Sequence, residues 1–311
     1  LSRQDPDAAF SYMVAEFHEN PQENMGDFID SLAIIFDNYT LKEIDRSGFN
    51  YGASSKNGTT YEYNGEIIYT DGSVSDLYIL FKKELMSYFN SPIAYIFIGV
   101  FLIVGNWLFF NSFFLIGQAS LRNYFSLLPW IFLFLSPAIT MRLWSEEKKS
   151  GTIEFLLTLP ITDWQVVLAK FFGALTFLFI TLLLSITLPI TAATLGNLDL
   201  GPVIGSYLGA LFLGGSYLAL GLFISGLTKN QIIAFVLGLA ACFGAFIVGA
   251  DFVLASAPQF VAPVMKFLGL GSHFYNIAKG VIDTKDIIYY LSFIFLFLWL
   301  NVRVIERRAW K

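Results

Sequence analysis

The chain has 311 residues and a formal net charge of −5; 56% of its residues are hydrophobic, 14% are charged, and its mean hydropathy is +0.62. With 33 Phe, this composition excludes an ordinary soluble domain and indicates that a lipid bilayer surrounds much of the chain. The single cysteine, Cys242, excludes an internal disulfide and a thiolate metal cluster. His18 and His273 are the only histidines and no carboxylates cluster, so the sequence predicts no metal site.

The charges divide the chain into two parts. Residues 1–74 contain thirteen Asp and Glu against four Lys and Arg, whereas residues 75–311 contain eleven against fifteen. We therefore predict an acidic soluble extension over residues 1–74 and a membrane domain over residues 75–311.

The extension is predicted to be a small α+β unit. Asp5 and Pro6 are typical of a helix N-terminus, and two apolar stripes at helical spacing follow them. The segment 59–70 reads TTYEYNGEIIYT and has two β-prone runs around Asn64-Gly65, a pair that favours a tight type I′ hairpin turn. The extension carries no catalytic constellation, so its role is not predicted.

The membrane domain begins with the segment 75–92, SDLYILFKKELMSYFNSP. Its apolar residues recur at helical spacing, and Lys82, Lys83 and Glu84 supply a polar face. This pattern predicts a helix that lies in the membrane interface and ends before Pro92.

Six apolar segments follow that could each cross a membrane, since a helix needs roughly 20 residues to span about 30 Å of hydrocarbon. They cover residues 93–116, 125–143, 165–195, 202–226, 231–253 and 287–305. The second contains Pro129 and Pro137, which a membrane helix tolerates when its neighbours satisfy the freed carbonyls. The predicted fold is therefore an all-α polytopic membrane protein with six transmembrane helices.

Lysine and arginine predict the orientation. If the helix 75–92 lies in the cytoplasm, eleven Lys and Arg of the membrane domain fall on that side. The other side holds four, which are Arg122, Lys266, Lys279 and Lys285. Both ends of the membrane domain are then cytoplasmic. The acidic extension is cytoplasmic too, since no span separates it from the helix 75–92.

The loop between the second and third predicted spans, 145–160, reads SEEKKSGTIEFLLTLP. Its apolar run is far too short to cross a bilayer. Gly151 ends one helix and Thr152 is placed to cap the next. Glu154 lies in the first turn of that helix, and Pro160 follows its end. Such a helix is unfavourable in water at roughly 25 cal/mol per Å² of exposed apolar surface. It therefore either lies under the spans or docks into a groove of a partner protein.

Three separated segments point to a known family. They read FKKELMSYFNSPIAYIFIG (81–99), RLWSEEKKSGTIEFLLTLPITDWQVVLAKF (142–171) and SHFYNIAKGVIDTKDIIYYLSFIFLFLWLNVRVIERRAW (272–310). They resemble the permease subunits of type-2 ATP-binding-cassette (ABC) transporters, most closely the gliding-motility-associated subgroup. The resemblance covers about residues 77–311 in register. Residues 1–74 are outside it, and are either a genuine cytoplasmic extension or a gene-boundary artefact.

The resemblance implies that the short loop helix is a coupling helix, seated on a separate ATPase subunit. It assigns this role to Glu146, Glu147, Gly151, Thr152, Glu154, Leu156, Leu157 and Pro160. It further implies an exporter in the bacterial cytoplasmic (inner) membrane, built from two permeases as a homodimer or a heterodimer. ATP and Mg would bind to the ATPase subunits. The chain itself has no G-x-x-x-x-G-K-[ST] loop, so we predict no enzyme activity, no cofactor on this chain and no nucleic-acid partner.

Four further residues stand out. Gly205 and Gly209 form a GxxxG pair in the fourth predicted span, which allows close helix packing either within one chain or between two. Asp251 is the one acidic residue deep in an apolar run; it either belongs to a substrate pathway or faces water at the outer end of the fifth predicted span. His273 matches a recurrent position of the resembled family, and otherwise serves as a capping or interface residue, with no metal implied.

Two other functions stay open at the level of sequence. A membrane-embedded enzyme requires paired Asp, Glu or His within the spans, and the sequence has none. A membrane scaffold that uses the ATPase for mechanical work, as in gliding, is compatible with the same residues. The apolar spans favour a lipid-like or polymeric substrate over a small ion.

Overall fold

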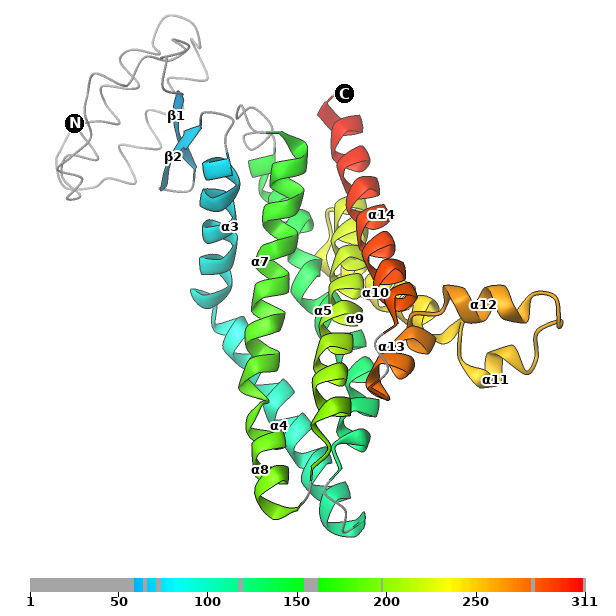
Figure 1. Cartoon of the computed structure of the whole chain (residues 1–311). Helices are drawn as coiled ribbons and strands as arrows, with labels where there is room; N and C mark the ends of the chain where they lie inside the picture. The colour runs from blue at the N-terminus through cyan, green and yellow to red at the C-terminus, as the bar shows by residue number, and fades with distance from the viewer. Residues whose placement is uncertain are drawn as a thin grey trace, which may run out of the picture. The chain divides into compact units, whose positions relative to one another are not determined.

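The computed structural model describes residues 59–63, 66–70, 74–116, 120–153, 162–196, 198–280 and 283–309. The elements in chain order are β1 (Thr59–Tyr63), β2 (Glu66–Thr70), α3 (Val74–Phe89), α4 (Pro92–Ile116), α5 (Arg122–Ser150), α7 (Asp163–Leu184), α8 (Thr187–Leu195), α9 (Leu200–Leu227), α10 (Gln231–Ile247), α11 (Asp251–Leu254), α12 (Ala262–Leu268), α13 (Leu270–Ala278) and α14 (Thr284–Ala309). The long helices form one bundle (Figure 1). All the described residues belong to one compact unit, residues 54–311.

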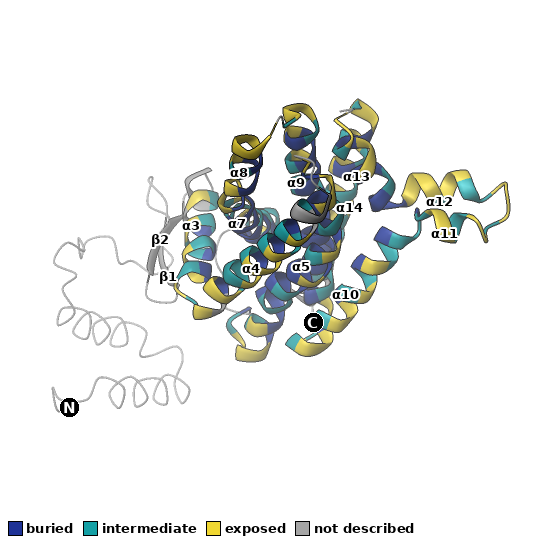
Figure 2. Ribbon diagram, turned by 90° about the horizontal axis from the view of Figure 1, so that it is seen from below, coloured by how far each residue is buried: buried dark blue, intermediate teal, exposed yellow. Residues whose placement is uncertain are grey.

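Helices α5 and α9 form the centre of the bundle. The middle of α9 is buried without interruption from Leu213 to Leu222. Glycine lets it approach its neighbours closely, because a Cβ at Gly221 would collide with the side chain of Thr140 on α5. In Figure 2 the buried residues gather between the helices, while α4 and α10 turn exposed sides outward.

Large apolar side chains cover the outside of the bundle. Ile103 and Trp107 on α4 are 71% and 65% exposed, and Ile232 on α10 is 73% exposed. Leaving such surface in water is unfavourable, whereas contact with hydrocarbon or with a partner is not, so this exterior matches a bilayer.

Five helical segments are long and apolar enough to cross a membrane, by length and composition, among the described residues: α4, α5, α7 with α8, α9 and α14. The predicted span 231–253 is wrong in its extent, because α10 ends at Ile247 and its 17 residues rise only about 25 Å. The chain turns where Gly249 packs against Gly269: a Cβ on Gly249 would lie 2.9 Å from the Gly269 Cα. This contact is not visible in the sequence, where the apolar run continues.

Two other predicted spans differ in length. The span predicted at 125–143 is part of α5, a helix of 29 residues that contains both prolines and continues through the charged residues to Ser150. The span predicted at 165–195 breaks after Leu184, and the chain continues as α8. After α10, the short helices α11 and α12 extend sideways from the bundle in both views (Figures 1 and 2).

The predicted hairpin is present as two antiparallel strands, with Tyr63 paired to Glu66. The turn residues 64–65 and the helices predicted in residues 1–58 lie outside the described residues. The helix predicted at 75–92 is also confirmed, as α3. It packs along the upper part of α7 (Figure 1), and its place in a membrane interface stays a prediction.

Candidate functional site

The end of α5 is the part of the bundle that the sequence singled out. Gly151 ends the helix with φ = +79°, a left-handed conformation that favours glycine. The Ser150 hydroxyl donates to the Glu146 carbonyl at 3.0 Å and lies 2.9 Å from the Thr152 hydroxyl. Thr152 therefore bonds back toward the end of α5. Residues 154–161 lie outside the described residues, and with them the predicted coupling residues Glu154, Leu156, Leu157 and Pro160.

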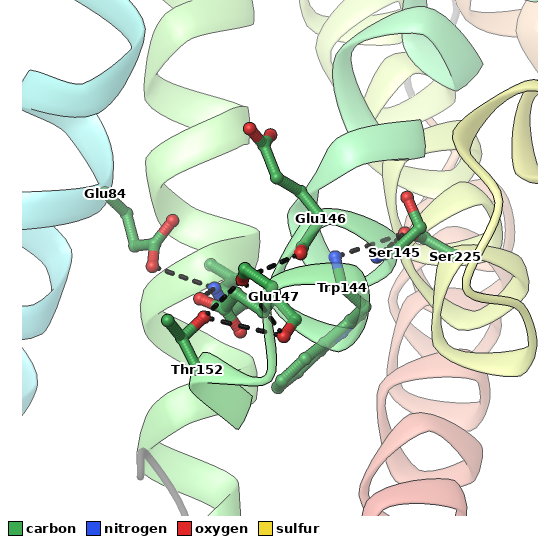
Figure 3. A network of polar contacts seen from close by, with 9 residues as sticks. Glu84, Trp144, Ser145, Glu146, Glu147, Thr152 and Ser225 are labelled. Atoms are coloured by element: carbon green, nitrogen blue, oxygen red, sulfur yellow. Dashed lines mark hydrogen bonds and ion pairs between the residues drawn. The ribbon is translucent and has the colours of Figure 1, made fainter. Parts of the chain in front are cut away.

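A buried lysine of α7 joins this end of α5 to α3. The Lys170 ammonium lies 2.6 Å from the Glu147 carboxylate of α5 and 2.9 Å from the Glu84 carboxylate of α3. The lysine side chain is 2% exposed, and the two glutamates are 12% and 14% exposed. The ammonium also lies 4.9 Å from the ring centroid of Trp144, a cation–π distance. Figure 3 shows Glu84 and Glu147 converging on this point from their two helices.

Helix α3 packs against this face of α7 over more than one turn. A Cβ on Gly173 would lie 3.1 Å from the Glu84 Cβ, so the missing side chain allows the close approach. One turn further, the rings of Phe177 and Tyr88 stack at 5.1 Å. Packing and charge thus hold α3 against α7 together.

On its opposite side, α5 is attached to the end of α9. The Ser225 hydroxyl accepts from the backbone N–H groups of Trp144 and Ser145, at 3.2 and 3.3 Å, and donates to the Met141 carbonyl at 3.0 Å. The buried Lys148 ammonium donates to the Gly226 carbonyl. A cation at the C-terminal end of a helix also interacts favourably with the helix dipole. The last two turns of α5 are therefore held by α9 on one side and by α7 and α3 on the other.

The two adjacent predicted coupling residues, Glu146 and Glu147, have different surroundings. Glu146 is exposed, and Figure 3 shows its carboxylate pointing away from the network. Glu147 points inward to Lys170. Of this pair only Glu146 is exposed, whereas the Glu147 carboxylate is turned to the buried lysine.

A second lysine balances the charge. Lys83 precedes Glu84 on α3, and its charge acts on Glu84 and Glu147. Burial lowers the pKa of Lys83 to about 8, against an ordinary value of 10.5, although the neighbouring carboxylates oppose that shift. Two lysines and two glutamates make the cluster neutral overall. Removing one partner of a buried ion pair costs about 3–5 kcal/mol, because a charge is left uncompensated.

The other predicted residues lie elsewhere. A Cβ on Gly205 would lie 2.7 Å from the Ile277 carbonyl oxygen, and one on Gly209 would lie 3.3 Å from the Ile277 side chain, so both glycines pack against α13 of the same chain. Asp251 is exposed as the first residue of α11, beyond the end of α10. Its pathway role stays a prediction.

His273 is buried in a polar contact with α14. Its Nδ1 lies 2.6 Å from the Asp286 carboxylate, and its Nε2 lies 2.8 Å from the Phe267 carbonyl oxygen. Because a carbonyl only accepts, Nε2 is the donor to Phe267, and Nδ1 faces the carboxylate. The pair therefore joins α14 to the segment between α12 and α13.

Four residues were not predicted to make these polar contacts: Glu84, Lys170, Ser225 and Asp286. Lys170 did carry a signal, since it lies inside the predicted span 165–195, and a cation in a span needs a counter-charge. The hydrogen bonds of Ser225 to α5 carried no signal beyond the small size of the residue, because a serine in an apolar helix commonly bonds only to its own backbone. Among the described residues, no group of three or more His, Cys, Asp and Glu is arranged to hold a metal ion.

Together these features define a multi-pass helical membrane protein with a rigidly held helix end next to a short apolar loop segment. The family described as ABC-2 family transporter protein matches residues 60–304, which is more than half of the chain. The chain belongs to this family and is a membrane permease component of an ABC transporter. Permeases of this family have no nucleotide-binding domain of their own, and the family implies an ABC ATPase partner. The matched range begins before residue 77, where the resemblance seen in the sequence begins, and so it includes β2. Membership of the gliding-motility subgroup stays a prediction. The comparison with curated proteins gives no match.

Proposed function

We propose that this chain is the permease half of an ABC exporter in the bacterial cytoplasmic membrane. Two such halves, identical or similar, form the path across the bilayer. ATP and Mg bind to separate ATPase subunits, and the segment 152–160 docks on one of them as a coupling helix. The family match supports the transporter, and the arrangement around α5 supports the coupling role.

The observation that carries this proposal is the attachment of α5 on two sides just before that segment. A push on residues 152–160 reaches Gly151 first and then the turn that holds Glu147 and Lys148. Through those two residues it acts on α7, α3 and α9 together. A docking segment rooted in a loosely held helix end would lose the displacement before it reached the spans.

The proposed orientation places this end of the bundle in the cytoplasm, on the eleven-to-four excess of lysine and arginine. Reporter fusions after Gly196 and after Lys311 should then report opposite sides of the membrane. The same side for both would contradict the orientation.

The coupling role is tested by changing the apolar surface of the segment. We expect Leu156→Asp with Leu157→Asp to release the ATPase in co-purification while the melting temperature of the permease changes little. Each carboxylate would have to be desolvated in the partner's groove without a counter-charge, which costs several kcal/mol.

Ile153 offers a matched contrast within the same segment. It is 8% exposed and packs against the core of the bundle. Ile153→Asp should therefore lower the melting temperature strongly, as a buried charge does. If the leucine variant instead keeps the ATPase and loses stability, the segment lies under the spans and the coupling role is wrong.

A further inference from the structure

We propose that Lys170 is a positioning residue that makes α3 and the adjoining ends of α5 and α7 into one rigid unit, so that α3 moves with the coupling segment when the ATPase displaces it. This inference rests on the proposed function. Helix α3 precedes the first candidate span, and the contacts of Lys170 with Glu84 and Glu147 join it to the end of α5.

The geometry places the lysine where three helices meet. One ammonium group contacts carboxylates from α3 and α5, at 2.9 and 2.6 Å, although Glu84 and Glu147 are 63 positions apart in the chain. The lysine is buried and both carboxylates are largely so, which weakens the screening of these charges by water. Moving α3 away from α5 would break the contact of the lysine with one of the two glutamates, so this bridge resists their separation.

A second level of contacts lies one to two turns away. The Arg142 guanidinium of α5 lies 5.3 Å from the ring centroid of Tyr88 and donates to the Ser91 hydroxyl at 3.3 Å. Tyr88 in turn stacks on Phe177 of α7. The three helices are therefore joined at two separate heights, which is what a rigid unit requires; a single contact would leave α3 free to pivot.

The connection between α3 and α4 is the natural pivot if the unit is broken. Only Asn90 and Ser91 separate the two helices, and α4 begins at Pro92, which has no N–H to continue the ladder of α3. A swing of about 15° about Asn90 would move residue 78 by about 5 Å, because twelve helical residues span about 18 Å.

The experiment measures the distance between α3 and the end of α5 in the complete complex with its ATPase, in lipid nanodiscs. Spin labels are placed by Tyr78→Cys and Lys149→Cys, both at exposed positions, after the single buried cysteine is removed by Cys242→Ala. The distance is recorded without nucleotide and with a non-hydrolysable ATP analogue.

We expect the same distance in both states for the otherwise unchanged chain and for Lys170→Arg. Lys170→Met alone strands two buried carboxylates and endangers folding, so the decisive variant combines it with Glu84→Gln, Glu147→Gln and Lys83→Met, which removes all four charges of the cluster. In that neutral variant the distance should differ between the nucleotide states by about 5 Å, the displacement that a swing of about 15° about Asn90 produces. Arg303→Met with Glu306→Gln removes an exposed ion pair of α14 and should behave like the unchanged chain.

A distance that shifts with nucleotide in the unchanged chain would overturn the inference, and so would a neutral variant that shows no shift. If the ATPase does not co-purify with the unchanged chain, the proposed function fails and the inference with it. If the ATPase is bound and the distances contradict the expectation, the inference alone fails.

Discussion

The attachment of α5 to α9 through Ser225 can be measured against an internal control. Ser225 and Ser216 both lie on α9, and both are fully buried. The Ser216 hydroxyl donates to the Phe212 carbonyl of its own helix at 3.0 Å. The Ser225 hydroxyl instead makes three contacts with the backbone of α5. The same substitution, Ser→Ala, therefore removes a local hydrogen bond at one position and an interhelical cluster at the other.

We expect Ser225→Ala to lower the free energy of unfolding by roughly 1–2 kcal/mol. Interhelical hydrogen bonds in membrane proteins contribute about 0.6 kcal/mol each on average, and three are lost, although the two N–H groups of α5 keep access to the carbonyls of their own helix. Ser216→Ala should change the free energy by less than about 0.5 kcal/mol, because a hydroxyl bonded within its own helix adds little stability.

The assay is reversible unfolding of the purified permease in mixed micelles, by titration with a denaturing detergent. Both variants and the unchanged chain are compared under the same conditions. Equal losses for the two variants would refute the reasoning, because they would show that the contacts across to α5 add nothing beyond the removal of a buried hydroxyl.

Three further predictions follow from the same structure. His273→Leu should lower the free energy of unfolding by about 3–5 kcal/mol by stranding the fully buried Asp286, whereas His273→Leu with Asp286→Leu should cost clearly less; equal melting temperatures for the two variants would contradict the buried pair. Gly205→Ala should destabilise the permease by about 1–3 kcal/mol, since its Cβ would meet the Ile277 backbone, while Gly244→Ala, with open space around it, should be neutral or stabilising in the same melting assay. The Lys83 pKa of about 8 lies below the unfolded value of 10.5, so the unfolded chain binds more protons between these two pH values. The free energy of unfolding should therefore rise from about pH 8 to 10. Lys83→Met should reduce that rise, and an unchanged dependence of stability on pH would exclude Lys83 as its source.

Local patterns in the sequence were sufficient for most of the elements. The apolar runs predicted the helices that became α4, α5, α7 with α8, α9 and α14, since the solvent acts on each stretch of about 20 residues by itself. Asn64-Gly65 predicted the hairpin, and Gly151 predicted the end of α5. Each of these signals depends on a few neighbouring residues, and so each can be recognised without knowledge of the rest of the fold.

The tertiary structure alone decided which polar residues face inward. Glu146 and Glu147 are neighbours with the same chemistry, and only the position of α7 makes one of them a buried partner of Lys170. The early end of α10 likewise depends on the approach of Gly269 to Gly249, twenty positions apart. Lys170 and Glu84 are separated by 86 positions, and their contact depends on how α3 and α7 pack together. Helical periodicity predicts which face of a helix is apolar, but the partner of a polar side chain is set by the relative placement of whole helices, which packing across the bundle determines.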